Sequence, residues 1–261
     1  MSLKFKKLVS LILAGAMAAS AFAFSAAAAE TETAAYVPDG EETISNNFNL
    51  HLSEGDVVKV TVSPQCDSMA VSVWGQISVD KSKLYVTDDL AAIKDDLAAV
   101  TEAVIIGDTF KQGVFGASIV ESGDALNVTA NTSYALDVYD FRQETPYVSA
   151  TFKALDDCET TVKTTISGIY KTIVDENDVH DVVPAMDEAS ASVDITINGY
   201  EMGDVTNDGY ITVADAIAVQ RHIANLETLS GANFTLADVN YDNNLSVADA
   251  IEIQRMIAGL V

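Results

Sequence analysis

The sequence of residues 204–215, Asp-Val-Thr-Asn-Asp-Gly-Tyr-Ile-Thr-Val-Ala-Asp, recurs in similar form at residues 238–249, Asp-Val-Asn-Tyr-Asp-Asn-Asn-Leu-Ser-Val-Ala-Asp. Numbered from its first Asp, each stretch has oxygen-bearing side chains at positions 1, 3, 5, 9 and 12. This is the ligand spacing of an EF-hand-type calcium loop. A short loop encloses Ca²⁺ only if it turns sharply at position 6, where Gly209 and Asn243 both tolerate a positive φ.

The predicted ligands of two Ca²⁺ ions are side-chain oxygens, with the backbone carbonyl at position 7 of each loop. In the first loop they are Asp204, Thr206, Asp208, Tyr210 and Asp215. In the second loop they are Asp238, Asn240, Asp242, Asn244 and Asp249. Position 9, Thr212 or Ser246, is expected to act through water. Position 12 is Asp rather than the usual Glu, and the neutral Thr206 predicts a weaker first site. The alternative is a pair of solvated Asp- and Asn-rich turns, which the duplication disfavours.

A matching helix is predicted after each loop. Residues 213–224 and 247–258 are closely similar, and each has one apolar stripe at helical spacing. The stripes are Ala216, Val219, Ile223 and Leu226, and Ala250, Ile253, Ile257 and Leu260. We therefore expect a small all-α domain at residues 199–261, in which bound metal stabilises a thin core.

Residues 200–261 resemble the dockerin family, calcium-binding modules of two such repeats found in cellulosomal proteins. The similarity is carried by residues 203–205, 207–209 and 237–240 and by the paired Gln-Arg. It implies that a cohesin contacts loop positions 10 and 11 and the residues seven positions later. Those residues are Val213, Ala214, Gln220, Arg221, Val247, Ala248, Gln254 and Arg255. Because both copies match, a partner could bind in two orientations related by a half turn. The alternative is that Gln and Arg are ordinary solvated helix residues.

The N-terminus has the pattern of a secretory signal peptide at residues 1–29. Lys4, Lys6 and Lys7 precede an apolar run from Leu8 to Ala23, and cleavage is expected near residues 28–29. A retained membrane helix is the weaker alternative, because the run is short and rich in Ala. Residues 30–42 are expected to form a flexible lead. The sequence thus predicts a secreted, extracellular protein.

The composition restricts the classes of partner. The formal net charge is −25, which argues against binding to nucleic acid or to an anionic membrane. Aromatic residues make up 7% of the chain and Trp74 is the single Trp. This scarcity argues against a polysaccharide-binding face.

Residues 43–198 are long enough for one domain and have many short runs of β-forming residues, which predict an antiparallel sandwich. The predicted strands are residues 57–62, 69–79, 84–86, 114–120, 125–130, 148–155, 161–169 and 191–197. Residues 88–103 instead have apolar residues at helical spacing, and Thr87 is a suitable N-cap. We expect one helix there, inserted between strands.

Residues 48–198 also resemble a cohesin, the partner module of dockerins, which implies a jelly-roll sandwich. The similarity is carried by residues 54–62, 74–84, 147–153 and 164–167, including a turn at residues 79–84. It implies that a partner dockerin contacts one sheet face, near Gln76, Ser78, Asp80 and Tyr85. The alternative is a β-sandwich binding module of another kind.

The sequence contains no Ser-His-Asp order, HExxH motif or phosphate-binding loop. We expect His51, His180 and His222 on the surface, and a non-enzymatic protein. Cys66 and Cys158 are either a disulfide or two free thiols. The resemblances together imply an adaptor scaffoldin of a cellulosome, which binds a scaffoldin cohesin and the dockerin of an enzyme or other component. The alternative is a dockerin-bearing component that binds carbohydrate or degrades polysaccharide.

Overall fold

The computed structural model describes residues 42–260, apart from 107, 112, 135–138 and 175–179. The predicted signal peptide and residues 30–41 of the lead lie outside the described residues. The strands of the first domain are β1 (Thr43–Leu52), β2 (Val57–Cys66), β3 (Met69–Ala70), β4 (Ser72–Asp80), β5 (Leu84–Val86), β6 (Val114–Ser122), β7 (Ala125–Ser133), β8 (Tyr139–Asp140), β9 (Val148–Ala154), β10 (Cys158–Val174), β11 (His180–Pro184), β12 (Ala189–Ile197) and β13 (Tyr200–Glu201). The helices are α2 (Asp88–Ile93), α3 (Leu97–Val104), η1 (Asp108–Lys111), η2 (Met186–Glu188), α4 (Val213–Ile223), α5 (Ala232–Ala237) and α6 (Val247–Ile257).

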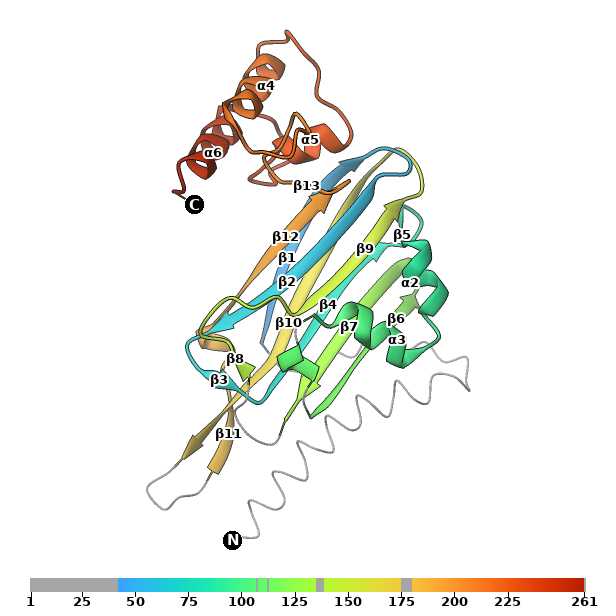
Figure 1. The fold of residues 1–261 in the computed structure, drawn as a ribbon, viewed down its shortest axis with the longest axis vertical. Coiled ribbons are helices and arrows are strands. Elements are labelled where there is room, and N and C mark those ends of the chain that lie inside the picture. Colours follow the sequence, from blue (N-terminus) through green and yellow to red (C-terminus); the bar gives the residue numbers. More distant parts are fainter. Residues whose placement is uncertain (1–41, 107, 112, 135–138, 175–179, 261) are drawn as a thin grey trace.

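The strands form two antiparallel sheets packed face to face, so the β-sandwich prediction is confirmed (Figure 1). One sheet has the order β1-β10-β4-β7-β6, with β11 paired to β10, and the other has the order β13-β12-β2-β9-β5. A separate two-stranded sheet joins β3 and β8. Six of the eight predicted strands fall within observed ones. The strand predicted at residues 69–79 is instead two strands, β3 and β4, and the one predicted at residues 148–155 ends one residue earlier, in β9. Four strands were not predicted: β1, β8, β11 and β13.

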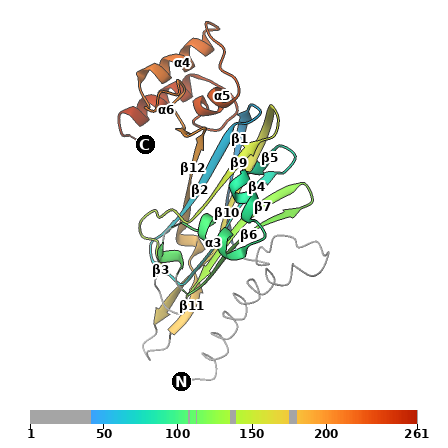
Figure 2. The same ribbon diagram turned by 45° about the vertical axis from the view of Figure 1, so that its right-hand side comes forward.

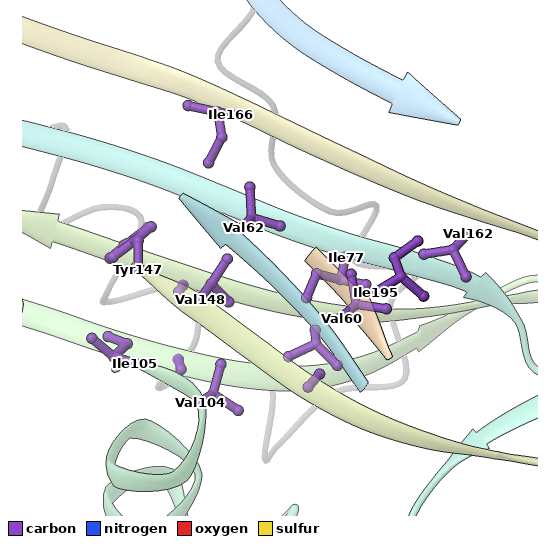
Figure 3. Close-up of a cluster of buried hydrophobic side chains, with 14 of the residues drawn as sticks. Val60, Val62, Ile77, Val104, Ile105, Tyr147, Val148, Val162, Ile166 and Ile195 are labelled. Carbon is purple, nitrogen blue, oxygen red and sulfur yellow. The ribbon is translucent and has the colours of Figure 1, made fainter. Parts of the chain in front are cut away.

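The core lies between the two sheets, where inward-facing residues alternate with outward-facing ones along each strand. Val60 and Val62 of β2 face Ile77 of β4 and Ile166 of β10, and all four side chains are buried (Figure 3). Gly75 of β4 also faces inward, because a Cβ atom there would lie 3.1 Å from the ring of Tyr147. The alternate residues of β4 consequently face outward, on the open face of the sheet.

The single helix predicted at residues 88–103 is instead two helices, α2 and α3. The chain breaks at Asp96, whose backbone is extended (φ −104°, ψ 97°) and whose carboxylate accepts hydrogen bonds from Ala98 N and Ala99 N. The side chain thus competes with the helix and caps a new one. Thr87 occupies the N-cap position of α2 but makes no capping hydrogen bond through its side chain.

The two cysteines lie at opposite ends of the sandwich. Cys158 opens β10 opposite Leu52, at the end where β2 begins, whereas Cys66 is the last residue of β2. Since β2 spans ten residues at about 3.3 Å per residue, the pair is too far apart for a disulfide, which requires Cα atoms within about 7 Å. Both cysteines are free.

The helices α4, α5 and α6 form a separate body at one end of the sandwich, beside the ends of β1 and β12 (Figures 1 and 2). The predicted boundary between residues 198 and 199 falls in the turn that joins β12 to β13. Among the described residues, no helix has both the length and the apolar character needed to cross a membrane.

Candidate calcium and partner-binding site

Each duplicated loop leads directly into a helix that begins with a capping box. Thr212 accepts a hydrogen bond from the backbone of α4, and the carboxylate of Asp215 accepts one from Thr212 N. Ser246 and Asp249 repeat this arrangement at α6. Positions 9 and 12 of each loop therefore fix the start of the helix. These residues were predicted only as part of the calcium sites, although Thr212-Val-Ala-Asp215 and Ser246-Val-Ala-Asp249 are recognisable capping motifs.

The helices α4 and α6 pack against each other through only the first half of each predicted stripe. Ala216 and Val219 are buried, and so are Ala250 and Ile253. The second half of the stripe is exposed, and that part of the prediction is wrong. The exposed members are Ile223 (36%), Leu226 (71%), Ile257 (41%) and Leu260 (66%). The reason is that α4 and α6 each end at their Ile, and the core is completed by residues outside these two helices. These are Val205, Leu229, Ala237 and Leu245.

In the first loop the acidic side chains fold inward onto the loop backbone. Asp204 accepts hydrogen bonds from Asp208 N at 3.1 Å and from Gly209 N at 2.9 Å. Asp208 accepts one from Tyr210 N at 3.0 Å. Oδ1 of Asp215 accepts two from Thr206, from N at 2.8 Å and from Oγ1 at 2.9 Å. Positions 1, 3, 5 and 12 are thus brought together, and Tyr210 at position 7 is 73% exposed.

The second loop has the same fold with one difference. Asp238 accepts hydrogen bonds from Asp242 N at 3.1 Å and from Asn243 N at 2.8 Å. Asp242 accepts one from Asn244 N at 2.9 Å. Asn240, at position 3, turns its Oδ1 to Asp242 N rather than to position 12. Oδ1 of Asp249 is consequently buried without a hydrogen-bond partner among the described residues.

Four carboxylates in this small body are almost fully buried: Asp204 (2% exposed), Asp215 (0%), Asp238 (1%) and Asp249 (0%). None of the ion pairs among the described residues includes any of them. A buried carboxylate without a cation is costly, and burial together with Asp249 and Asp242 raises the pKa of Asp238. The unpartnered oxygen of Asp249 and the pairs of buried carboxylates fit a bound divalent cation with oxygen ligands.

His, Cys, Asp and Glu side chains do not by themselves form a metal-holding group of three or more in the part of the chain that the structure describes. The predicted ligand sets do not depend on these residue types alone. They also include the Thr206 hydroxyl, the Asn240 amide and the carbonyls of Tyr210 and Asn244. When bound, Ca²⁺ would supply the positive charge that the buried carboxylates lack.

The eight predicted partner-binding residues occupy equivalent exposed places on α4 and α6. Val213 and Val247 are each 58% exposed, and Ala214, Gln220, Arg221, Ala248, Gln254 and Arg255 are exposed as well. Arg221 pairs with Glu227 and Arg255 with Glu252. Two further apolar residues extend this exposed surface: Ile217 (47% exposed) and Ile251 (51% exposed) lie one turn after Val213 and Val247. Their i, i+4 spacing was visible in the sequence.

Residues 202–258 match the model of one protein family, the dockerin type I domain. The C-terminal region is a dockerin type I domain. A search of the curated proteins gave no match. The dockerin implies a cohesin as its partner and an extracellular, cellulosome-associated location. Type I dockerins typically bind calcium, in agreement with the buried carboxylates. The β-sandwich is of unassigned family.

The four residues suggested for the sandwich do not form one partner-binding face. Gln76 is buried, and its Nε2 donates to Oδ1 of Asn127 at 2.5 Å. Tyr85 belongs to the other sheet, and its hydroxyl donates to Glu121 at 2.9 Å. Asp80 holds the following turn through two hydrogen bonds from Ser82, which lower the pKa of its carboxyl. Ser78 and Asp80 are both half-buried on the outer face of β4. The prediction of one shared sheet face is therefore wrong for Tyr85, and the partner contact itself stays a prediction.

Two histidines expected on the surface have structural roles instead. Nδ1 of His222 accepts a hydrogen bond from Leu229 N at 3.0 Å and holds the chain after α4. His51 is half-buried where β1 meets the dockerin. The side chain of His180 lies outside the described part of the structure.

Proposed function

We propose that this protein is a non-catalytic adaptor scaffoldin. Its dockerin binds a cohesin of a larger scaffoldin when two Ca²⁺ ions are bound, and its sandwich binds the dockerin of an enzyme or other component. The main support is the pair of matched apolar patches on the dockerin. Val213 and Ile217 on α4 are exposed to nearly the same extent as Val247 and Ile251 on α6.

Calcium acts in this proposal by fixing the helix starts. Asp215 and Asp249 are at once the last loop ligands and the capping residues of α4 and α6. A cation held at these carboxylates therefore sets the position of the first helical turn, which carries Val213 or Val247. Both patches are exposed beside the sandwich, so either helix can meet a cohesin.

The outer face of the β10-β4-β7 part of the sheet supports the second half of the proposal. Residues 72–79, 125–133 and 161–169 of these strands contain no Asp or Glu, although the chain as a whole has a net charge of −25. Amide and hydroxyl side chains line this face, with Lys163 among them. A neutral, flat face of this kind does not repel an acidic dockerin.

One observation favours the alternative function. Trp74 alternates with the inward-facing Gly75 and is half-buried on the outer face of β4. Its cross-strand neighbours are Ser167 of β10 and Asn131 of β7. An aromatic ring between hydroxyl and amide groups is suited to a sugar ring, so a carbohydrate-binding sandwich is the second candidate.

A pull-down with the full chain separates the two candidates. Ile217→Asp and Ile251→Asp together disable the chain's own dockerin patches, and this variant is immobilised in calcium. Capture of a purified dockerin-bearing enzyme supports the adaptor. Failure to capture any dockerin, with retention of the chain on a polysaccharide gel that Trp74→Ala abolishes, would replace it with the carbohydrate-binding function.

A further inference from the structure

The two calcium loops differ at positions 4 and 6, between the predicted ligands. The first loop has Asn207 and Gly209, whereas the second has Tyr241 and Asn243. The backbone of Tyr241 is left-handed, with φ 59°, a conformation that favours Gly or Asn and is unusual for a bulky residue. The backbone strain at Tyr241 indicates that its side chain makes a stabilising contact outside the loop.

Tyr241 and Asn243 both contact β1 of the sandwich. The ring of Tyr241 packs edge-on against Phe48, with centroids 4.7 Å apart and an interplanar angle of 72°. Oδ1 of Asn243 lies 2.5 Å from Nε2 of His51. Tyr241 also packs against the sandwich core.

The helix α5, which leads into the second loop, is seated on the same strand. The hydroxyl of Thr235 accepts a hydrogen bond from His51 N at 2.6 Å and donates one to His51 O at 2.7 Å. It thereby satisfies both backbone groups that β1, at the sheet edge, turns away from β10. Leu236 is fully buried in the sandwich core, and Phe234 lies against the His51 ring at 4.3 Å.

The docked segment and the calcium ligands are parts of one short stretch of chain. Asp238, the first ligand of the second loop, is the C-cap of α5, and its N–H donates to the carbonyls of Phe234 and Thr235. Tyr241 and Asn243 alternate with the ligands Asn240, Asp242 and Asn244. Along residues 240–244, the predicted cation ligands therefore alternate with the residues that contact the sandwich.

We propose that docking of the second loop on β1 and Ca²⁺ binding in that loop stabilise each other. The first loop is coupled to the sandwich less directly, through the hydrogen bonds from Asp204 N to Glu201 O of β13 and from Asn207 to Asn233 of α5. The reciprocity is required by thermodynamic linkage. The joint between the two domains would then be rigid when calcium is present. This inference rests on calcium binding within the proposed function, and does not depend on which partner either domain takes.

The first test changes only the sandwich. His51→Ala and Phe48→Ala leave every loop residue in place, and Asn47→Ala on the exposed side of β1 is the matched control. Ca²⁺ is titrated into the full-length chain while the amide signals of Gly209 and Asn243 are followed by NMR. We expect the second-loop dissociation constant to rise by about fivefold or more, with a smaller rise in the first loop and a change below about twofold in the control.

The second test changes the loop. Tyr241→Asn with Asn243→Gly gives the second loop the first loop's residues at positions 4 and 6. We expect the protection of the His51 amide from hydrogen exchange to fall in the presence of Ca²⁺, since Thr235 would no longer be held against it. Unchanged affinity of the second loop in the sandwich variants, together with unchanged His51 protection here, would overturn the coupling. If neither loop of the unaltered chain titrates with Ca²⁺, the calcium part of the proposed function fails as well.

Discussion

The hydroxyl of Thr206 donates a hydrogen bond to Oδ1 of Asp215 at 2.9 Å. The equivalent oxygen in the second repeat, Oδ1 of Asp249, is buried without a partner among the described residues. The position 3 side chain accounts for one part of the difference, because the Thr206 hydroxyl donates to position 12 whereas the Asn240 carbonyl accepts from Asp242 N. The backbone N–H of Thr206 donates a second hydrogen bond to Oδ1 of Asp215, at 2.8 Å. A cation entering the first loop must displace a hydrogen bond that the second loop does not have.

We therefore predict that Thr206→Asn strengthens calcium binding in the first loop. Removing the competing hydrogen bond to a charged group is worth about 1 kcal/mol, which lowers the dissociation constant roughly fivefold. Calorimetric titration of the full chain with Ca²⁺ measures this change. The matched control is Asn240→Thr, which should weaken the second loop by a similar factor. If the unaltered chain, Thr206→Asn and Asn240→Thr have the same calcium affinities in both loops, the residue at position 3 does not cause the difference in affinity between the loops.

A second prediction concerns the charge of Asp249. Asp249→Asn keeps an oxygen that can accept the capping hydrogen bonds from Ser246, but it removes a buried negative charge. In chelator the variant should be more stable than the unaltered chain, because an uncompensated buried charge is costly. In calcium the order should reverse, since a Ca²⁺ ion at 100 times its dissociation constant adds about 2.7 kcal/mol to the folded state.

Thermal unfolding followed by circular dichroism, with and without calcium, checks this reversal. Asp67→Asn is the control, because Asp67 is exposed on the sandwich and its replacement should leave both curves unchanged. A variant that is less stable than the unaltered chain under both conditions would mean that Asp249 acts as a helix cap alone.

The fold of the two duplicated loops was predictable because it is set by local contacts. A carboxylate at position 1 and a turn at position 6 lie within one loop, so the spacing of Asp204 and Gly209 already specifies the fold of the segment. The strands with alternating Val and Ile were predictable for the same reason. β1 was missed because its Asn residues are poor strand formers, and the strand is fixed by its long register with β10.

The contact between the domains could not be predicted from the sequence. Tyr241 and Asn243 are visible as departures from the first loop, but nothing in the sequence connects them with Phe48 or His51, nearly two hundred residues earlier. The short helix α5 was missed as well, because its six residues show no helical period by themselves. Packing on β1 fixes this segment, and such tertiary contacts override local propensity.

A third prediction is that Cys66 and Cys158 remain thiols even after export. Alkylation under denaturing, non-reducing conditions should label both residues, and mass spectrometry counts the labels. In the folded chain Cys66 should react more slowly, because it is buried and its Sγ donates to Ser68 O at 3.2 Å. Burial also raises the pKa of the Cys158 thiol, which reduces its reactive thiolate near neutral pH. An unlabelled pair would place the two residues in a disulfide that this fold does not allow.

The fourth prediction tests whether the two dockerin helices are interchangeable. Ile217→Asp should place a charge within the apolar patch of α4, and Ile251→Asp should do the same on α6. Each single variant leaves the other patch intact, so it should lose only about a factor of two in cohesin affinity, because one of two equivalent orientations remains. The double variant should lose binding by a factor of 100 or more, since burying an unpaired charge costs several kcal/mol.

Surface plasmon resonance with an immobilised type I cohesin in calcium measures these affinities. Gln220→Ala and Gln254→Ala together give a control in which both helices are altered without a new charge. The same measurements identify a dockerin that binds cohesin through one helix only. If Ile217→Asp alone abolishes binding while Ile251→Asp has no effect, α4 is the single binding helix. The matching exposure of Val247 and Ile251 would then reflect the sequence duplication without a second binding orientation.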